Sequence, residues 1–381
     1  MKTVIGIAAA VISMLPLAAG AQSPEPAVKS RTVVRIVQQT QAERRVQERL
    51  RESQQRQREA QERARERNNQ SRRDDREEQT EKISRTLKIG GNGELDLSTV
   101  AGDITVTRGG GNVAQLEVIK VARGRTVEEA RQMLSAVTVD VAERGSRAEV
   151  STRYPDRDQA NRQRRSINVT VQYTLTAPEN TTITANSISG SIRITDIKGD
   201  VNAESISGDV IITNGARVMT AKSTSGNVEI TNLESQIGIE AGTVSGNLVV
   251  RQARVPRVEL TTVSGNLVVE NLDCGRVDVT TVTGNIDFTS ALARNGRYEL
   301  SSHSGVIRFV PTGNTGFSLD ADSFSGDIRS EVTLKDQKQG GADYRRRGPG
   351  GRTRSLSGTF GDGGAMLEIS TFSGSVVIGK K

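Results

Sequence analysis

The sequence predicts an all-β fold in which short parallel strands stack as a β-solenoid, also called a β-helix, for which we expect right-handed winding. A glycine preceded by Ser or Thr recurs from Gly190 to Gly374, at spacings of 18, 18, 20, 19, 19, 21 and 21 residues and one final gap of 48. Residues five and seven positions before each of these glycines are apolar, and so is the residue two positions after it. This period-2 pattern on both sides of a turn indicates two short strands in every repeat.

The length of the repeat indicates that its copies stack. A unit of about 19 residues cannot bury its apolar side chains alone, whereas copies about 4.8 Å apart enclose a continuous narrow core. Residues Leu95 to Val106 carry the same pattern around Gly102, so we expect about ten rungs within residues 87–381. Aromatic residues make up 3% of the chain, with no Trp, so the core should be aliphatic.

Residues 1–21 have the three regions of a secretory signal peptide. Lys2 precedes an apolar run from Val4 to Ala18, and small residues lead to Ala21, after which we expect cleavage. Gln22 is not a lipid acceptor, and the apolar run is too short for a good membrane span, although a retained N-terminal anchor stays open. We expect an exported protein, periplasmic, on the cell surface or extracellular, with no transmembrane span in the mature chain.

Residues 22–86 form a charged arm that is rich in Arg, Glu and Gln. It carries 17 Lys and Arg against 12 Asp and Glu, and its apolar residues are too sparse for a coiled-coil seam. The pairs Glu52–Arg56 and Glu59–Arg63 favour a helix by a few tenths of a kcal/mol each, so the arm should be helical or disordered. It either meets anionic surfaces or serves as a solvated spacer.

An insert at residues 112–181 separates the first rung from the others. It contains strand-like runs and one helix candidate, Val127 to Ala136, for which Thr126 and Glu129 form a capping box. We therefore expect a small α+β insert packed on the first rungs.

A second insertion, residues 331–365, is rich in Gly and in basic residues. We expect a mobile basic loop there. Its basic residues are Lys335, Lys338, Arg345, Arg346, Arg347, Arg352 and Arg354.

The repeats carry a family resemblance. The run "APENTTITANSISGSIRITDIKGDVNAESISGDVIITN", the reiterated "TVSGNLVV" and the preceding insert resemble the bacterial β-strand-repeat family of unknown function labelled "putative adhesin". The resemblance covers about residues 86–381. It implies a cell-surface or envelope location and no family reaction.

Two ladders of polar residues accompany the glycines. A hydroxyl stands three positions before each glycine, and Asn or Asp often follows it, as at Asp209 and Asn227. We interpret both ladders as structural, with the hydroxyls satisfying one another and the turn, and with Gly followed by Asn or Asp suiting the positive φ of a tight corner.

The position two before the glycine is mostly apolar. Strict alternation would turn it outward and the hydroxyls inward, whereas a bend at the corner would bury it. Burial of each such side chain is worth about 1.5–3 kcal/mol, so we predict the inward arrangement. The side chains concerned are Ile188, Ile206, Val244, Val263, Val282, Phe324 and Phe372.

Charged columns are the candidate ligand contacts. Acidic residues recur six positions before the glycine, at Glu240, Glu259, Asp278, Glu299, Asp320 and Glu368. Arginines precede three of them, at Arg257, Arg276 and Arg297. The columns either neutralise each other or bind a polymer through bidentate Arg, carboxylates or bridging divalent ions. Arg345, Arg346 and Arg347 of the basic loop are further candidates.

Composition excludes most catalytic chemistry. One Cys, Cys274, and one His, His303, supply no disulfide framework, zinc site or Cys/His pair, and we expect no cofactor or metal. Identical exposed carboxylates lack the desolvated member that a general acid needs. His303 occupies the mostly apolar position, so we interpret it as a corner residue.

These observations favour a secreted, non-enzymatic envelope protein, an adhesin-like module that binds or spaces envelope components. The expected partner is an anionic envelope polymer or surface, or another envelope protein. Because base-stacking aromatics are scarce, no nucleic acid is expected. A carbohydrate-active β-helix enzyme, lyase or glycosidase, and a rod that self-associates through its ends remain the alternatives.

Overall fold

The computed structural model describes residues 77–155, 168–341 and 354–380. All of them belong to one compact unit, residues 76–381. Strands dominate this part of the chain, which contains a single α-helix, so the predicted all-β class is confirmed. The expected signal peptide, the arm up to residue 76 and Arg345, Arg346 and Arg347 lie outside the described residues.

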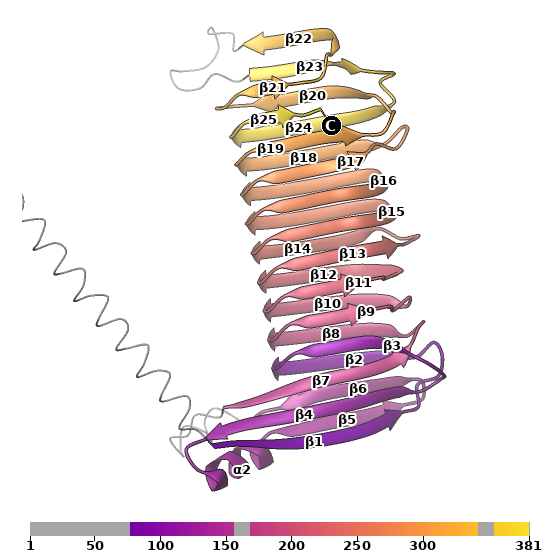
Figure 1. Ribbon diagram of the computed structural model, residues 1–381, viewed down its shortest axis with the longest axis vertical. Helices are drawn as coiled ribbons and strands as arrows, with labels where there is room; N and C mark the ends of the chain where they lie inside the picture. The colour runs from indigo at the N-terminus through magenta and orange to yellow at the C-terminus, as the bar shows by residue number, and fades with distance from the viewer. Residues whose placement is uncertain (1–76, 156–167, 342–353, 381) are drawn as a thin grey trace, which may run out of the picture. The chain divides into compact units, whose positions relative to one another are not determined.

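Each rung has a first strand before its glycine and a second strand after it (Figure 1). The first strands, in stacking order, are β2 (Glu94–Ala101), β8 (Thr182–Ser189), β10 (Asp200–Ser207), β12 (Arg217–Ser225), β14 (Ile239–Ser245), β15 (Leu248–Ser264), β16 (Leu267–Thr283), β18 (Arg297–Ser304), β24 (Ala365–Ser373) and β20 (Phe317–Ser323). All these neighbours pair in parallel. The stack therefore has ten rungs in the described part of the chain.

The second strands form another parallel ladder. They are β3 (Ile104–Gly109), β9 (Ile192–Thr195), β11 (Val210–Thr213), β13 (Val228–Glu234), the beginnings of β15 and β16, β17 (Ile286–Ala291), β19 (Ile307–Thr312), β25 (Val376–Ile378) and β21 (Ile328–Ser330). Strands β15 and β16 run without a break from the second strand of one rung to the first strand of the next.

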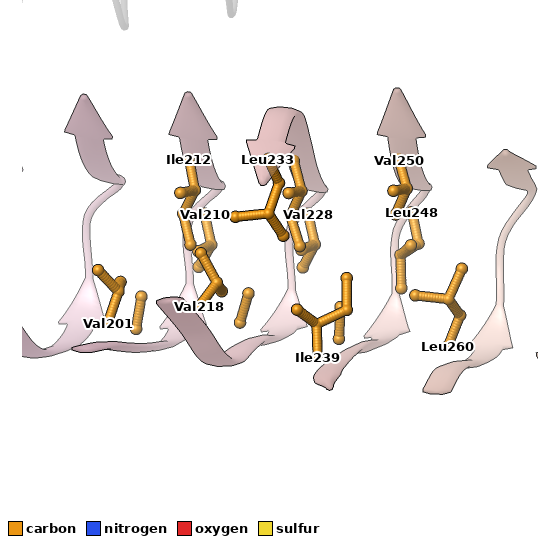
Figure 2. Packing of buried hydrophobic residues seen from close by; sticks show 14 of the residues in the cluster. Val201, Val210, Ile212, Val218, Val228, Leu233, Ile239, Leu248, Val250 and Leu260 are labelled. Carbon is orange, nitrogen blue, oxygen red and sulfur yellow. The ribbon is translucent and has the colours of Figure 1, made fainter. Parts of the chain in front are cut away.

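The core lies between these two ladders. Figure 2 shows side chains such as Val201, Val210 and Ile212 filling it, each at most 1% exposed. One repeat departs from the predicted pattern, because Met219 is 46% exposed and Val218 is buried in its place. The register between β10 and β12 shifts there by one residue, so the strand bulges and turns Met219 outward.

The core is aliphatic over the first rungs but becomes aromatic toward the last ones. The rings of Phe288 and Phe309 stack with centroids 5.4 Å apart, and Phe317 meets Phe309 edge to face at 5.8 Å. Tyr298 is also fully buried, and its hydroxyl donates to the carbonyl oxygen of Cys274 at 2.8 Å. The prediction of an aliphatic core therefore fails here, because the few aromatic residues of the chain are concentrated in neighbouring rungs.

The last two rungs do not stack in chain order. Strand β24 lies between β18 and β20, so the C-terminal rung is inserted between the two rungs that precede it in sequence. Strand β20 then pairs antiparallel with β23 (Arg354–Phe360), which pairs antiparallel with β22 (Lys335–Gly341). The segment expected as a mobile basic loop thus supplies two strands that cover this end of the stack.

The insert covers the other end. Strand β6 (Arg147–Arg153) adds to β2 in parallel and pairs antiparallel with β5 (Thr138–Arg144). Strand β7 (Val169–Pro178) pairs in parallel with β3 and antiparallel with β4 (Ala114–Gly124). Strand β4 in turn pairs antiparallel with β1 (Glu77–Leu87).

Strand β1 differs from its expected state, because residues 77–86 were assigned to the helical or disordered arm. Ion pairs across to β4 stabilise it: Glu81 meets Lys120 at 2.6 Å, and Glu78 meets Arg123 at 2.9 Å. Directly opposite charges favour strand pairing, and here they replace the apolar alternation from which a strand would be predicted.

Helix α2 (Val127–Ala136) has the predicted boundaries and N-cap. The Thr126 hydroxyl accepts from the Glu129 N–H at 3.2 Å, whereas the Glu129 carboxylate accepts from the Arg125 N–H at 2.8 Å, one residue before the N-cap. At the other end, Lys120 donates to the carbonyl oxygens of Leu134 and Val137 at 3.2 and 3.1 Å. A buried lysine on β4 therefore caps the C-terminus of the helix.

Candidate functional site

The outer face of the first strands carries a column of exposed apolar side chains. Strict alternation continues to the corner, so the hydroxyl three before each glycine is buried and the next residue points outward. The predicted inward arrangement is therefore wrong: Ile206 is 52% exposed, Phe372 49% and Val263 42%. We call this column the apolar stripe; its members are Val100, Ile188, Ile206, Val244, Val263, Val282, Phe372 and Phe324, with Thr224 at this position in the β12 rung and His303 in the β18 rung.

Hydrogen bonds between rungs explain why most of the hydroxyls lie inside, although the buried Ser187, Thr281 and Thr371 hydroxyls have no hydrogen-bond partner among the described residues. Ser205 Oγ donates to the carbonyl oxygen of Gly190 at 3.0 Å, and Ser223 Oγ donates to that of Gly208 at 2.8 Å. Each such bond offsets the free-energy cost of burying a hydroxyl. The prediction that the apolar side chains point inward overestimated this cost. The predicted structural role of this ladder is thus supported.

The Asn and Asp ladder also joins rungs, but by another mechanism than predicted. The Asn227 side-chain oxygen accepts from the Asn247 N–H at 2.9 Å, and Asn247 accepts likewise from Asn266 at 3.0 Å. Among the described residues, positive φ occurs at repeat glycines such as Gly305, with φ of 147°, and six positions after the glycine at Asn214 and Asn232, with φ of 55° and 56°, but not at the Asn and Asp residues that directly follow the glycine. The residues after the glycine therefore serve as side-chain acceptors for the neighbouring rung.

Aromatic rings continue the stripe at its C-terminal end. The His303 ring stacks on Phe372 with centroids 4.8 Å apart, and Phe324 stacks on the other side at 4.7 Å. His303 thus occupies the stripe position of its rung, as predicted for a corner residue. The three rings form a continuous stacked column, in which His303 and Phe372 are exposed and Phe324 is half-buried.

A groove of about 750 Å³ runs beside the stripe across β2, β8, β10, β12, β14 and β15. One side is mostly apolar, lined by Val100, Ile188, Ile206, Val244 and Val263 and interrupted by Thr224. The other side is polar, lined by Ser98, Asn186, Glu204, Lys222, Gly242 and Thr261. The groove therefore crosses the strands and follows the stacking direction.

The predicted charged columns lie on this same outer face. Arg257 meets Glu259 at 3.1 Å, and Arg297 lies between Glu299 at 3.8 Å and Glu368 at 3.3 Å. Such exposed pairs support mutual neutralisation over part of the face and contribute little stability.

Other charged groups of the face are less balanced. Arg276 lies in register with Arg257 and Arg297, but neither it nor Asp278 forms an ion pair within the described residues. Burial raises the pKa of Asp322, and the nearby carboxylates of Asp320 and Glu368 raise it further. Negative charge is therefore uncompensated near the aromatic end of the stripe.

The face as a whole carries a negative excess from β10 to β20. The eight carboxylates are Glu204, Glu240, Glu259, Asp278, Glu299, Asp320, Asp322 and Glu368. The four cations are Lys222, Arg257, Arg276 and Arg297. This count omits the neighbouring pair Arg217–Asp200, which is self-balanced at 2.7 Å. The surplus of four negative charges was not evident before the outward direction of every position was known.

The one cysteine of the chain, Cys274, is a buried core residue. The Cys274 thiol is 2% exposed, donates to the Arg276 carbonyl oxygen at 3.0 Å, and has its pKa raised to about 11 by burial. A thiol with so high a pKa is a poor nucleophile at neutral pH.

Within the described residues, no three His, Cys, Asp or Glu side chains gather closely enough to hold a metal ion. No helix in the same residues is long and apolar enough to span a membrane.

Fold and surface together define an all-β, solenoid-like repeat protein with an exposed apolar stripe. The chain belongs to the Toastrack DUF4097 family, whose model matches residues 146–269 and 219–363 and so covers more than half of the sequence. The resemblance to a β-strand-repeat family of unknown function is thereby confirmed. No curated protein matches the chain.

Three solved structures show a weak likeness. A "putative adhesin" from Bacteroides fragilis is 12% identical with a TM-score of 0.37, and the match covers 78% of this chain and 97% of that one. A "putative adhesin" from Parabacteroides distasonis is 11% identical, with coverage of 78% and 97% and a TM-score of 0.33. A "putative lipid binding protein" from the same species is 12% identical, with coverage of 78% and 96% and a TM-score of 0.31. At these TM-scores the likenesses carry no conclusion about function.

Proposed function

We propose that this protein is an exported, non-enzymatic, adhesin-like binding module of the bacterial envelope, built as a right-handed parallel β-solenoid. The observation that carries the proposal is the apolar stripe, whose aliphatic members are 36–52% exposed from Val100 to Val282. Contiguous exposed apolar surface rimmed by polar residues is typical of an interaction site. The basic arm and the 342–353 segment would add attraction to an anionic polymer or surface.

The carboxylates of the groove do not favour the carbohydrate-active alternative. Glu204 and Glu240 are exposed, and Glu240 pairs with Lys222 at 2.5 Å. A general acid works best in a desolvated setting of its own, which neither carboxylate has. Binding therefore explains this face better than catalysis does.

The ends of the stack disfavour a self-assembling rod. Strand β22, the outermost strand of the C-terminal cover, carries Lys335, Asp336 and Lys338, and β1 is rich in charged residues at the other end. Charged edge strands discourage pairing between copies. The outer face remains the surface best suited to a partner.

The proposal is tested by site-specific photocrosslinking in the intact envelope. A photoreactive amino acid replaces Val263 in the stripe or Val268, an outward residue of the opposite ladder in the same rung. We expect a discrete crosslinked species from position 263 and none from position 268, with the partner identified by mass spectrometry. Equal crosslinking from both positions, or none from position 263, would contradict the proposal.

A further inference from the structure

We propose that the outer face binds a basic amphipathic α-helix of a partner polypeptide, which lies along the stack with its apolar side on the apolar stripe. This inference rests on the proposed function, because it assigns a partner chemistry to the same face. It uses three observations: the paired backbone of the face, the spacing of its apolar side chains and its negative excess.

The backbone of the outer face excludes recognition by strand addition. The first strands from β2 to β20 have parallel partners on both sides or an antiparallel partner at the end, so their N–H and C=O groups are already used. A polypeptide lying across them must satisfy its own backbone hydrogen bonds. An α-helix does so within one segment.

The spacing of the stripe suits the contact side of a helix. Thr224 interrupts the stripe at β12, but from β14 to β20 every rung places one apolar or aromatic side chain on it, about every 4.8 Å, close to the 5.4 Å pitch of an α-helix. The six rungs from β14 to β20, along which the acidic column runs beside the stripe, span about 24 Å at that spacing. A helix of about 16 residues spans this length and presents apolar residues at i, i+3 or i+4, and i+7.

The charges determine which flank of the helix is basic. From β14 to β20 the acidic column lies four residues from the stripe along each strand, or about 13 Å away, within reach of Lys and Arg side chains on one flank. On the other side of the stripe the corner is lined by neutral hydroxyls such as Ser245 and Ser264. The face therefore fits a helix with cations along a single flank.

The same charges disfavour two other occupants. An anionic membrane or polymer would be repelled by uncompensated carboxylates such as Asp278 and Asp320. A second copy that places stripe on stripe with the stacks reversed would set one acidic column against the other. Both occupants remain outcomes of the test.

The experiment measures binding of an 18-residue helical Leu/Lys peptide, with all lysines on one flank, to the chain from residue 22 to 381. Two peptide controls have a scrambled order or Glu in place of Lys. We expect both controls to bind at least tenfold more weakly. Raising the salt concentration should weaken binding of the Lys peptide.

Matched variants locate the binding surface. The double variant Val244→Ser/Val263→Ser should weaken binding at least tenfold, whereas Val249→Ser/Val268→Ser, in the same two rungs on the opposite ladder, should leave it unchanged. Asp278→Asn should weaken binding about threefold and reduce its salt dependence. Asp287→Asn, exposed on the opposite ladder, is its control.

The outcomes separate the inference from the function on which it rests. Equal binding of the three peptides, or equal effects of the two double variants, overturns the helix assignment. Stripe-dependent dimerisation in sedimentation, or stripe-dependent binding to neutral phosphatidylcholine vesicles without peptide binding, overturns it in favour of a second copy or a lipid surface. If the peptide fails to bind while position 263 still crosslinks to an envelope partner, the inference fails and the proposed function stands. If crosslinking fails as well, both fail.

Discussion

Single glycines determine how closely neighbouring rungs approach at the corner. A Cβ on Gly265 would lie 1.9 Å from the carbonyl oxygen of Gly246, and the φ of Gly265 is +157°. The same contact recurs between Gly284 and Gly265, so the column of glycines follows from close backbone approach as well as from turn geometry. The regular spacing of glycines in the sequence therefore results from this close contact between neighbouring rungs.

Gly265→Ala should destabilise the fold strongly, by about 3 kcal/mol or more, because backbone rather than a flexible side chain must move. Gly275→Ala is the matched control, since the nearest atom to its Cβ would be the Pro256 carbonyl oxygen at 3.8 Å. Urea denaturation of both variants measures the difference. Similar midpoints for the two would show that the corner tolerates a side chain.

The direction of the stripe could not be predicted from side-chain hydrophobicity alone. Burial of Val263 or Ile206 looked more favourable than burial of a hydroxyl, but Thr243 Oγ1 donates to the Gly226 carbonyl oxygen at 2.8 Å and is thereby compensated. That acceptor comes from another rung, which a single strand's pattern does not reveal. The hydroxyl at this position in every repeat was the available signal.

At the scale of elements, helix α2 was predictable and strand β1 was not. The helix carries its own signals, a capping residue at Thr126 and apolar periodicity that buries Ala130, Met133 and Leu134. Strand β1 depends instead on cross-strand partners in β4, about 40 residues further along the chain. Its charged composition resembles that of the preceding arm, so no local feature marks where the strand begins.

Lys120→Met tests how β1, β4 and α2 are joined. The substitution should leave the carbonyl oxygens of Leu134 and Val137 without their lysine donor, and Glu81 without its cation. We expect a loss of about 2–4 kcal/mol and reduced helical circular dichroism.

The control is Lys82→Met, whose lysine is 59% exposed and pairs with Glu117 at 2.7 Å. We expect the control to change stability by less than about 0.5 kcal/mol. Equal losses in the two variants would show that Lys120 has no special capping role.

At the scale of the described unit, the number of rungs was predictable but their final order was not. Leu300, Ala321 and Ile369 are interchangeable as core residues, so the repeat pattern cannot show that β24 enters between β18 and β20. The 48-residue gap before Gly374 marks the place where chain order is broken. The pattern likewise does not encode the antiparallel strands that cover both ends.

The acidic column and the apolar stripe lie side by side only once the rungs are stacked. Residues such as Glu259 and Val263 are four positions apart in sequence, and the stack repeats this arrangement rung after rung on one face. Of the predicted contacts, Glu240, Glu259, Asp278, Glu299, Asp320, Arg257, Arg276 and Arg297 come together there. The apolar stripe between them and the corner was predicted to be core and is the candidate site.

The substitution Val263→Asp tests most directly whether the stripe faces outward and binds. Because Val263 is 42% exposed, we expect an unchanged melting temperature, within about 2 °C of the parent protein, together with at least tenfold lower retention on the isolated envelope. A fall in melting temperature of more than about 10 °C would show that the side chain faces the core. Normal melting with undiminished retention would show that the stripe is not the binding surface.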